Sequence, residues 1–294
     1  MTVAPADLTL PAAPARRKDG LRTYIRRHPT IIAGALLLAI MALLAIFAPY
    51  LGTVDPQALS PIRRLRWPSA QYWFGTDMLG RDVYSRTIYG ARISLTVGLS
   101  VALLSTALGL VIGLVTGFSR WTDAIVMRIM DGLMSIPSIL IAIALMALTR
   151  ASLQNVVFAI TIAEVPRVTR LVRGVVLSLR ELPFVEAAHA SGTGFFRILR
   201  RHILPNTIPP LLVQGTFVAA SAMIVEAILS FLGAGTPPNI PSWGNIMAEG
   251  RSLFQVAYYI VLFPGAFLSV TVLAINLLGD GLRDALDPRL QRRM

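Results

Sequence analysis

The stretch EAAHASGTGFFRILRRHILP, residues 186–205, is a basic, glycine-containing segment that separates two strongly apolar parts of the sequence. Gly192 and Gly194 allow the positive φ that a sharp turn requires, and Pro205 interrupts helical hydrogen bonding. The pattern therefore predicts two short helices joined by a turn. The predicted elements are a helix over 186–191, a turn over 192–194 and a helix over 195–203.

The second of these predicted helices is amphipathic. Phe195, Ile198, Leu199 and His202 recur at helical spacing and form one mainly apolar stripe. The arginines that follow Phe196 and Leu199 lie off that stripe. Such a helix either rests on anionic lipid headgroups or places its stripe in a groove of a partner protein. These residues alone leave both interpretations open.

The composition indicates a membrane protein. Of the 294 residues, 55% are hydrophobic and 14% are charged, whereas about a quarter of a soluble domain is charged. A net charge of +12 would suggest nucleic acid in a soluble protein, but here the arginines gather at the ends of apolar windows. The positive-inside rule and anionic lipids account for that distribution, so no nucleic-acid partner is expected.

Six charge-poor windows predict about six transmembrane helices, since roughly 20 apolar residues span a bilayer. The sixth window is short and reaches membrane length only if its helix continues through Glu164 and Pro166. The windows are Thr30–Leu51, Ile93–Phe118, Gly132–Thr149, Ala151–Ala163, Asn206–Val225 and Ser252–Gly279. The fold class expected is therefore an all-α polytopic membrane protein.

The distribution of basic residues predicts how these windows are oriented. Most of the 27 lysines and arginines fall on the side that holds both termini, which the positive-inside rule makes cytoplasmic. We therefore expect a multi-pass protein of the inner or plasma membrane that is in contact with membrane lipids. The expected organisation is a cytoplasmic tail at 1–29, a first transmembrane helix at 30–51, an extracytoplasmic segment at 52–92, a core at 93–283 with a cytoplasmic loop at 181–205, and a cytoplasmic tail at 284–294.

Two further patterns concern packing. In the extracytoplasmic segment, Asp77 with Arg81 and Asp82 with Arg86 are acid-before-base pairs at helical i, i+4 spacing, which would offset part of its positive charge. In the second window, small residues recur at every fourth position and predict close approach of a neighbouring helix. These small residues are Ser105, Gly109, Gly113 and Gly117.

Polar residues inside the apolar windows are candidate functional groups, and Glu226 and Asn276 are the two that we single out. We expect Glu226 to bond a neighbouring helix near the outer end of its span, so that Glu226→Gln impairs assembly or transport but not ATP binding. The sequence holds no catalytic motif and no cysteine, and its three histidines are too few for an imidazole metal site. An enzyme and a metal site are therefore not expected.

The residues from Glu186 to Pro205 resemble the EAA motif of permease subunits of ABC importers. The motif positions are Glu186, Ala187, Ala188, Gly192, Leu204 and Pro205, with His202 at a usually apolar position. Three further stretches are similar to the dipeptide and oligopeptide branch of that family. They are FGTDMLGRDVYSRTIYGARISL from Phe74, LSFLGAGTPPNIPSWGNIM from Leu229 and DALDPRL from Asp284.

The resemblance implies the MetI-like ABC permease fold and a role in ATP-driven import. In that family the EAA loop, here residues 181–205, forms helices that seat in a cleft of a separate ATPase subunit. The implied contact residues are Glu186, Ala187, Ala188, Gly192, Phe195, Leu204 and Pro205. The implied partners are a homologous permease subunit, two ATP-binding subunits that hold ATP and magnesium, and an extracytoplasmic binding protein.

The resemblance favours peptides as the substrate, while relatives also carry nickel, glutathione or other small solutes. A secondary transporter driven by an ion gradient is the remoter alternative. The chain cannot hydrolyse ATP by a Walker mechanism, because that motif needs a lysine and the only one is Lys18. No cofactor is therefore expected in this chain.

Overall fold

The computed structural model describes residues 29–286. The regular secondary structure of this range is helical, and the range contains no strand. The helices are α2 (Pro29–Ile46), α3 (Val83–Phe118), α4 (Arg120–Met134), α5 (Ser138–Leu148), α6 (Leu153–Arg180), α7 (Pro183–Ala190), α8 (Phe195–Ile198), α9 (Leu204–Phe231), α10 (Trp243–Gly250) and α11 (Tyr259–Leu286). Short 3₁₀ turns lie at Ala48–Tyr50, Pro61–Arg63 and Arg251–Leu253, and a π-helical turn lies at Leu199–Ile203.

Four helical segments in the described range are long and apolar enough to cross a membrane: α2, α3, the run Phe195–Phe231 and α11. A fifth is added if α4 and α5, which meet at 90°, are counted as one broken span. Helix α6 runs without a break through Glu164 and Pro166, as its short window required. Each of the six predicted windows therefore contains helix, and the all-α membrane class is confirmed.

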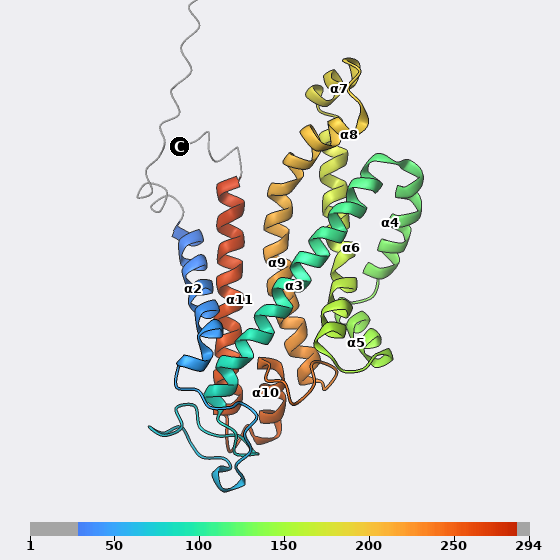
Figure 1. The fold of residues 1–294 in the computed structure, drawn as a ribbon. Coiled ribbons are helices and arrows are strands. Elements are labelled where there is room, and N and C mark those ends of the chain that lie inside the picture. The colour runs from blue at the N-terminus through green and yellow to red at the C-terminus, as the bar shows by residue number, and fades with distance from the viewer. Residues whose placement is uncertain (1–28, 287–294) are drawn as a thin grey trace, which may run out of the picture.

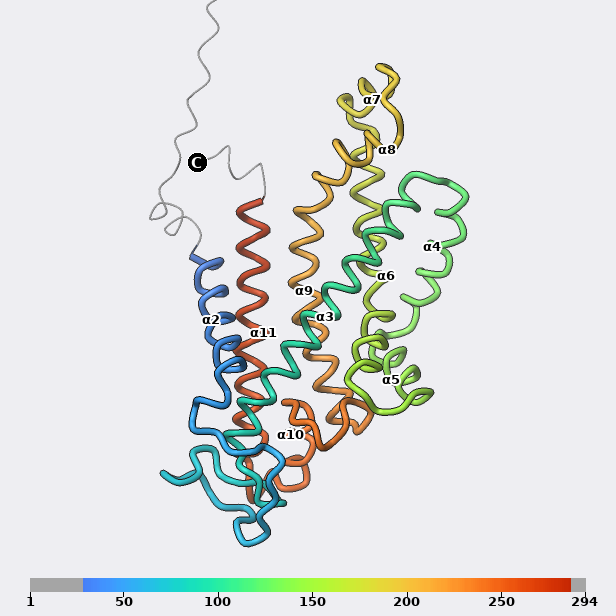
Figure 2. Tube along the Cα trace, in the orientation of Figure 1, coloured from blue at the N-terminus to red at the C-terminus, as the bar shows by residue number. Residues whose placement is uncertain are grey.

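The long helices α2, α3, α6, α9 and α11 run along the molecule, and α3 crosses obliquely over α9 and α6 (Figures 1 and 2). Helices α7 and α8 project at one end. The connecting segment, residues 47–82 between α2 and α3, lies with α10 at the opposite end. The two polar parts of the chain are thus separated by the full length of the bundle.

Helix α3 packs most closely on α6, as the small residues predicted. A Cβ added at Gly113 would lie 2.6 Å from Cβ of Val172, and one added at Gly117 would lie 2.5 Å from a methyl carbon of Val176. Real Cβ atoms essentially never come this close, so only glycine allows this spacing of the two backbones. The main hydrophobic core is built along this contact.

Several helix boundaries differ from the predicted windows. Helix α3 begins at Val83 and not at Ile93, so residues 83–92 of the predicted extracytoplasmic segment are helical. The charges of Arg86 and Arg92 concealed this, because Arg86 is ion-paired and Arg92 donates to the carbonyl oxygens that end α2. A charged residue whose partners are supplied by another element does not end a helix.

The third and last windows are also corrected. Residues 135–137 break the third window, since Pro137 cannot continue the hydrogen bonding of α4 and instead precedes α5. The last helix begins at Tyr259 and not at Ser252, because residues 251–253 form a separate 3₁₀ turn. Residues 284–286 of the predicted C-terminal tail belong to α11. The rest of both predicted tails, apart from Pro29, lies outside the described residues.

Candidate functional site

The turn after α7 closes the helix in a Schellman motif. The Thr193 N–H donates to the Ala188 carbonyl oxygen at 3.0 Å, and the Gly192 N–H donates to that of His189 at 2.9 Å. Gly192 has φ +73°, and a Cβ there would meet no atom within 4 Å. Glycine is therefore favoured at this position by backbone conformation and not by lack of space.

Two predictions about the EAA loop are wrong in detail. Gly194 has φ −66° and precedes α8 in an extended conformation, so the turn uses a positive φ at Gly192 alone. Pro205 does not end a helix, because the chain continues directly into α9. The Leu204 N–H donates to the Leu199 carbonyl oxygen in a π-helical turn, and this shifted pattern accommodates the proline that follows.

Apolar contacts fix the EAA loop to the bundle. Val185, Ile198 and Ile203 are buried in the same hydrophobic core as α3 and α6. The Phe195 ring meets the Phe118 ring edge-on, with ring centroids 4.8 Å apart. Most of the predicted stripe faces inward, since Ile198 is buried and Leu199 and His202 are half-buried, while Phe195 stays 45% exposed. The inward part packs on the protein's own bundle.

The exposed face of the loop carries most of the motif residues. Glu186, Ala187 and Gly192 are exposed, as is Pro205, whereas Ala188 and Leu204 are half-buried. Phe184, Phe195 and Phe196 also reach the surface, and Phe196 is 80% exposed. The loop thus presents a firmly held face with the carboxylate of Glu186, small side chains and exposed aromatic rings.

The two intramembrane candidates behave differently. Glu226 is fully buried on α9, where its Oε1 accepts a hydrogen bond from Ser230 Oγ at 2.8 Å and its Oε2 has no partner in the described range. That bond lies within α9, and hydroxyl contacts continue from Ser230 to Thr236 and on to Ser242, the N-cap of α10. Asn276 is half-buried on α11 and makes no side-chain hydrogen bond within residues 29–286.

Glu164 of α6 is a buried carboxylate that joins two helices. Its Oε1 accepts from Ser221 Oγ of α9 at 3.2 Å, and its Oε2 pairs with Arg167 at 3.1 Å. The i, i+3 spacing of Glu164 and Arg167 could have indicated the ion pair. The contact between α6 and α9 has no signal in sequence.

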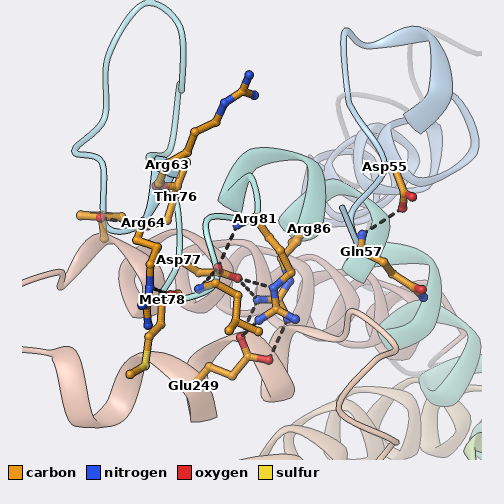
Figure 3. A network of polar contacts seen from close by, with 12 residues as sticks. Asp55, Gln57, Arg63, Arg64, Thr76, Asp77, Met78, Arg81, Arg86 and Glu249 are labelled. Atoms are coloured by element: carbon orange, nitrogen blue, oxygen red, sulfur yellow. Dashed lines mark hydrogen bonds and ion pairs between the residues drawn. The ribbon is translucent and has the colours of Figure 1, made fainter. Parts of the chain in front are cut away.

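A buried ion cluster ties the connecting segment to α10 (Figure 3). Asp77 Oδ2 pairs with Arg81 Nε at 2.7 Å and with Arg86 Nη1 at 2.5 Å. Glu249 of α10 pairs with both arginines, with Arg86 Nη2 donating to its Oε1 at 3.0 Å. The Asp77–Arg81 pair is confirmed. The predicted Asp82–Arg86 pair is wrong, because Asp82 caps α3 by accepting from the Ser85 N–H.

Within residues 29–286, no three His, Asp or Glu side chains lie close enough together to hold a metal ion. Many polar groups of this part of the chain act instead in helix caps and in ion pairs between elements.

Comparison with known proteins identifies the family. The profile of the family described as "Binding-protein-dependent transport system inner membrane component" matches residues 105–292. A solved chain of the MetNI methionine ABC transporter in an inward-facing conformation shares the fold, with a TM-score of 0.55 at 21% identity over 69% of this chain and 96% of that chain. The MetI-like fold expected from the sequence is confirmed.

Curated relatives match over nearly their whole length. The probable peptide ABC transporter permease protein y4tQ of Sinorhizobium fredii is 55% identical over 91% of this chain and 92% of its own. The dipeptide permease protein DppC of Alkalihalophilus pseudofirmus is 43% identical over 91% and 88%. The glutathione permease protein GsiD of Pectobacterium atrosepticum is 41% identical over 92% and 90%. The chain therefore belongs to the family of inner-membrane components of binding-protein-dependent transport systems.

Proposed function

We propose that this chain is a permease subunit of an ATP-driven importer of short peptides, forming half of the translocation path. The observation that carries the proposal is the EAA loop, in which motif residues lie exposed on a frame buried in the transmembrane core. The peptide substrate rests on the relatives, since y4tQ and DppC are named for peptide and dipeptide transport.

The proposed complex contains three kinds of partner. A homologous permease subunit completes the path, and an extracytoplasmic binding protein delivers the substrate. Two ATP-binding subunits hold ATP and magnesium and contact the permease subunits at their EAA loops. ATP hydrolysis is assigned to the partners because the only lysine of this chain is Lys18. The distribution of basic residues supports a cytoplasmic position for both termini and the EAA loop.

The chain's own part in the mechanism is to carry movement from the loop into the bundle. Val185, Ile198 and Ile203 hold the loop to the core, so a displacement of α7 must also displace α3 and α6. ATP-bound partners can shift the equilibrium between inward- and outward-facing states only by binding the two states with different affinity. Glu186, Ala187, Ala188 and Gly192 are the proposed contact for that differential binding, supported at the base by Phe195, Leu204 and Pro205.

The test is uptake of a labelled dipeptide into proteoliposomes that contain the assembled complex, with ATP inside and the binding protein outside. Uptake should require both and should survive collapse of the proton gradient at constant ATP. Glu186→Arg should abolish uptake and release the ATPase subunits in a pull-down. Glu181→Arg is the matched control, since Glu181 is equally exposed but lies before α7.

The outcomes separate the alternatives. Uptake that stops when the proton gradient collapses would indicate a secondary transporter. Uptake of glutathione or nickel in place of the dipeptide would keep the importer and replace its substrate. A Glu186→Arg complex that stays intact and transports normally would remove the EAA loop from the proposed ATPase contact.

A further inference from the structure

The connecting segment encloses a cavity of about 300 Å³. Its walls include Arg63, Tyr72, Trp73, Gly80, Asp82 and Tyr84. All of these residues precede the part of the chain that matches the family profile, which begins at residue 105. The cavity therefore lies outside the residues matched by the family profile, and neither the EAA loop nor the ion cluster accounts for it.

The cavity has a fixed frame. The Arg63 N–H donates to the Ser60 carbonyl oxygen at 2.8 Å, and Thr76 Oγ1 donates to that of Arg63. Gly80 has φ +74°, and a Cβ there would lie 1.9 Å from the Ser60 carbonyl oxygen. This close approach of two backbone strands sets one wall of the cavity, so its shape is built into the fold.

Two opposite charges in the cavity wall have no ionic partner within residues 29–286. Asp82 Oδ2 accepts from the Ser85 N–H at 2.8 Å and from Ser85 Oγ at 2.5 Å, which leaves Oδ1 without a hydrogen bond in that range. The Arg63 guanidinium likewise makes no hydrogen bond or ion pair there, and it lies 6.0 Å from the centre of the Tyr72 ring. Figure 3 shows its side chain extended away from the ion cluster.

Three neighbouring arginines, in contrast, have partners within the described residues. Arg81 and Arg86 are neutralised by Asp77 and Glu249, and Arg64 Nε donates to the Met78 carbonyl oxygen. The cavity wall thus contains one cation and one anion that no ion pair of the described residues neutralises. Aromatic rings line the space with them, and the Trp73 and Tyr84 ring centroids are 4.8 Å apart.

We propose that this cavity binds the zwitterionic backbone of a short peptide, with the free carboxylate at Arg63 and the free ammonium group at Asp82. A guanidinium binds a carboxylate through two parallel hydrogen bonds, and an ammonium group is attracted both by a carboxylate and by aromatic faces. A volume near the lower limit of small-molecule pockets selects a short peptide over a long one. The proposal rests on the proposed function and adds a receiving site outside the transmembrane path.

The test measures binding to the complete permease–ATPase complex in lipid nanodiscs, with the binding protein omitted. The probe is labelled alanyl-phenylalanine, compared with its N-acetylated and its C-amidated forms by equilibrium dialysis. The wild-type complex should bind each blocked form about tenfold more weakly, because each has lost one charge-assisted contact. The Arg63→Gln complex should bind the C-amidated form as well as the free dipeptide, while it still binds the N-acetylated form more weakly. The Asp82→Asn complex should bind the N-acetylated form as well as the free dipeptide, while it still binds the C-amidated form more weakly.

Asparagine also caps helices, so Asp82→Asn should leave the start of α3 intact. Arg64→Gln is the control, because Arg64 is a neighbouring arginine whose contact is with Met78. This variant should still bind both blocked dipeptides more weakly than the free one. If Arg63→Gln and Asp82→Asn also bind both blocked forms more weakly while the complex imports the dipeptide, the cavity proposal is wrong and the proposed function stands.

Two other results would also overturn the cavity proposal. In a separate pull-down with the binding protein added, variants that weaken its attachment without changing peptide discrimination would make the cavity a protein contact. A wild-type complex that neither binds nor imports the dipeptide would remove the proposed peptide function together with the cavity's ligand.

Discussion

Gly192 shows how one residue can define the end of the EAA loop. Its φ of +73° is a conformation that costs an L-amino acid about 1 to 2 kcal/mol, while the space around it is open. The glycine-rich turn was predictable from sequence, but the sequence could not say which glycine carries the positive φ. That depends on where α7 ends, and α7 ends where its last carbonyl groups meet the turn's N–H groups.

Gly192→Ala should weaken the attachment of the ATPase subunits. If the whole strain falls on that contact, about 1 to 2 kcal/mol corresponds to a roughly 5- to 30-fold loss of affinity. Gly194→Ala is the matched control, since Gly194 has φ −66° and equally open surroundings, and it should bind normally. Titration of detergent-solubilised permease with purified ATPase subunits measures both. Equal affinities for the two variants would contradict the assignment.

Glu226 is a second position where we expect one side chain to affect assembly of the complex. Glu226→Gln should lower the yield of assembled complex, because the amide places two N–H donors at the position of Oε2, which makes no hydrogen bond in the described range. Each unsatisfied buried donor costs about 1 to 3 kcal/mol. Gel filtration measures the yield, and ATP binding to whatever complex forms should stay unchanged. Glu181→Gln, an exposed change, should have no effect, and a normal yield and transport rate for Glu226→Gln would refute the prediction.

At the scale of elements, sequence patterns predicted the helices better than their ends. Charge-free windows found all six regions, yet they placed the start of α3 ten residues late because they treated Arg86 and Arg92 as breaks. Both side chains are satisfied by other elements, Arg86 by Asp77 and Glu249 and Arg92 by the end of α2. Glu249 is far from Arg86 in sequence, and no local pattern joins the two.

The ion cluster should matter more to stability than an exposed ion pair of the same kind. Asp77→Asn leaves Arg86, whose side chain is 2% exposed, with only Glu249 as an ionic partner. Removing one partner of a buried pair costs about 3 kcal/mol or more. Asp131→Asn removes a pair in which Asp131 and Arg170 are both at least half exposed, and such pairs contribute about 1 kcal/mol or less.

Thermal unfolding of the solubilised complex compares the two variants directly. The Asp77→Asn complex should unfold several degrees below the wild type, and the Asp131→Asn complex should stay close to it. The opposite order would mean that the connecting segment is held to α10 by its apolar contacts and not by the ion cluster.

For the whole molecule, the two polar ends have different designs. The EAA loop at one end is anchored by buried apolar side chains and leaves its motif residues exposed. The connecting segment at the other end is fixed by buried charges to α10 and encloses a cavity with free charges. The sequence motif predicted the first end because its residues are contiguous. It missed the cavity, because that site exists only when residues on both sides of a turn are folded together.

The orientation of these ends in the membrane can be tested with single cysteines, since the chain has none of its own. Ala70→Cys in the connecting segment and Ala190→Cys in the EAA loop are matched, exposed substitutions at opposite ends. In intact cells, a membrane-impermeant maleimide should label the cysteine at position 70 and not the one at 190, because the arginines beside the loop favour the cytoplasm. After the membrane is permeabilised, both should react, which shows that each cysteine is accessible. Labelling of position 190 in intact cells would place the EAA loop outside, where no ATP-driven partner could act on it.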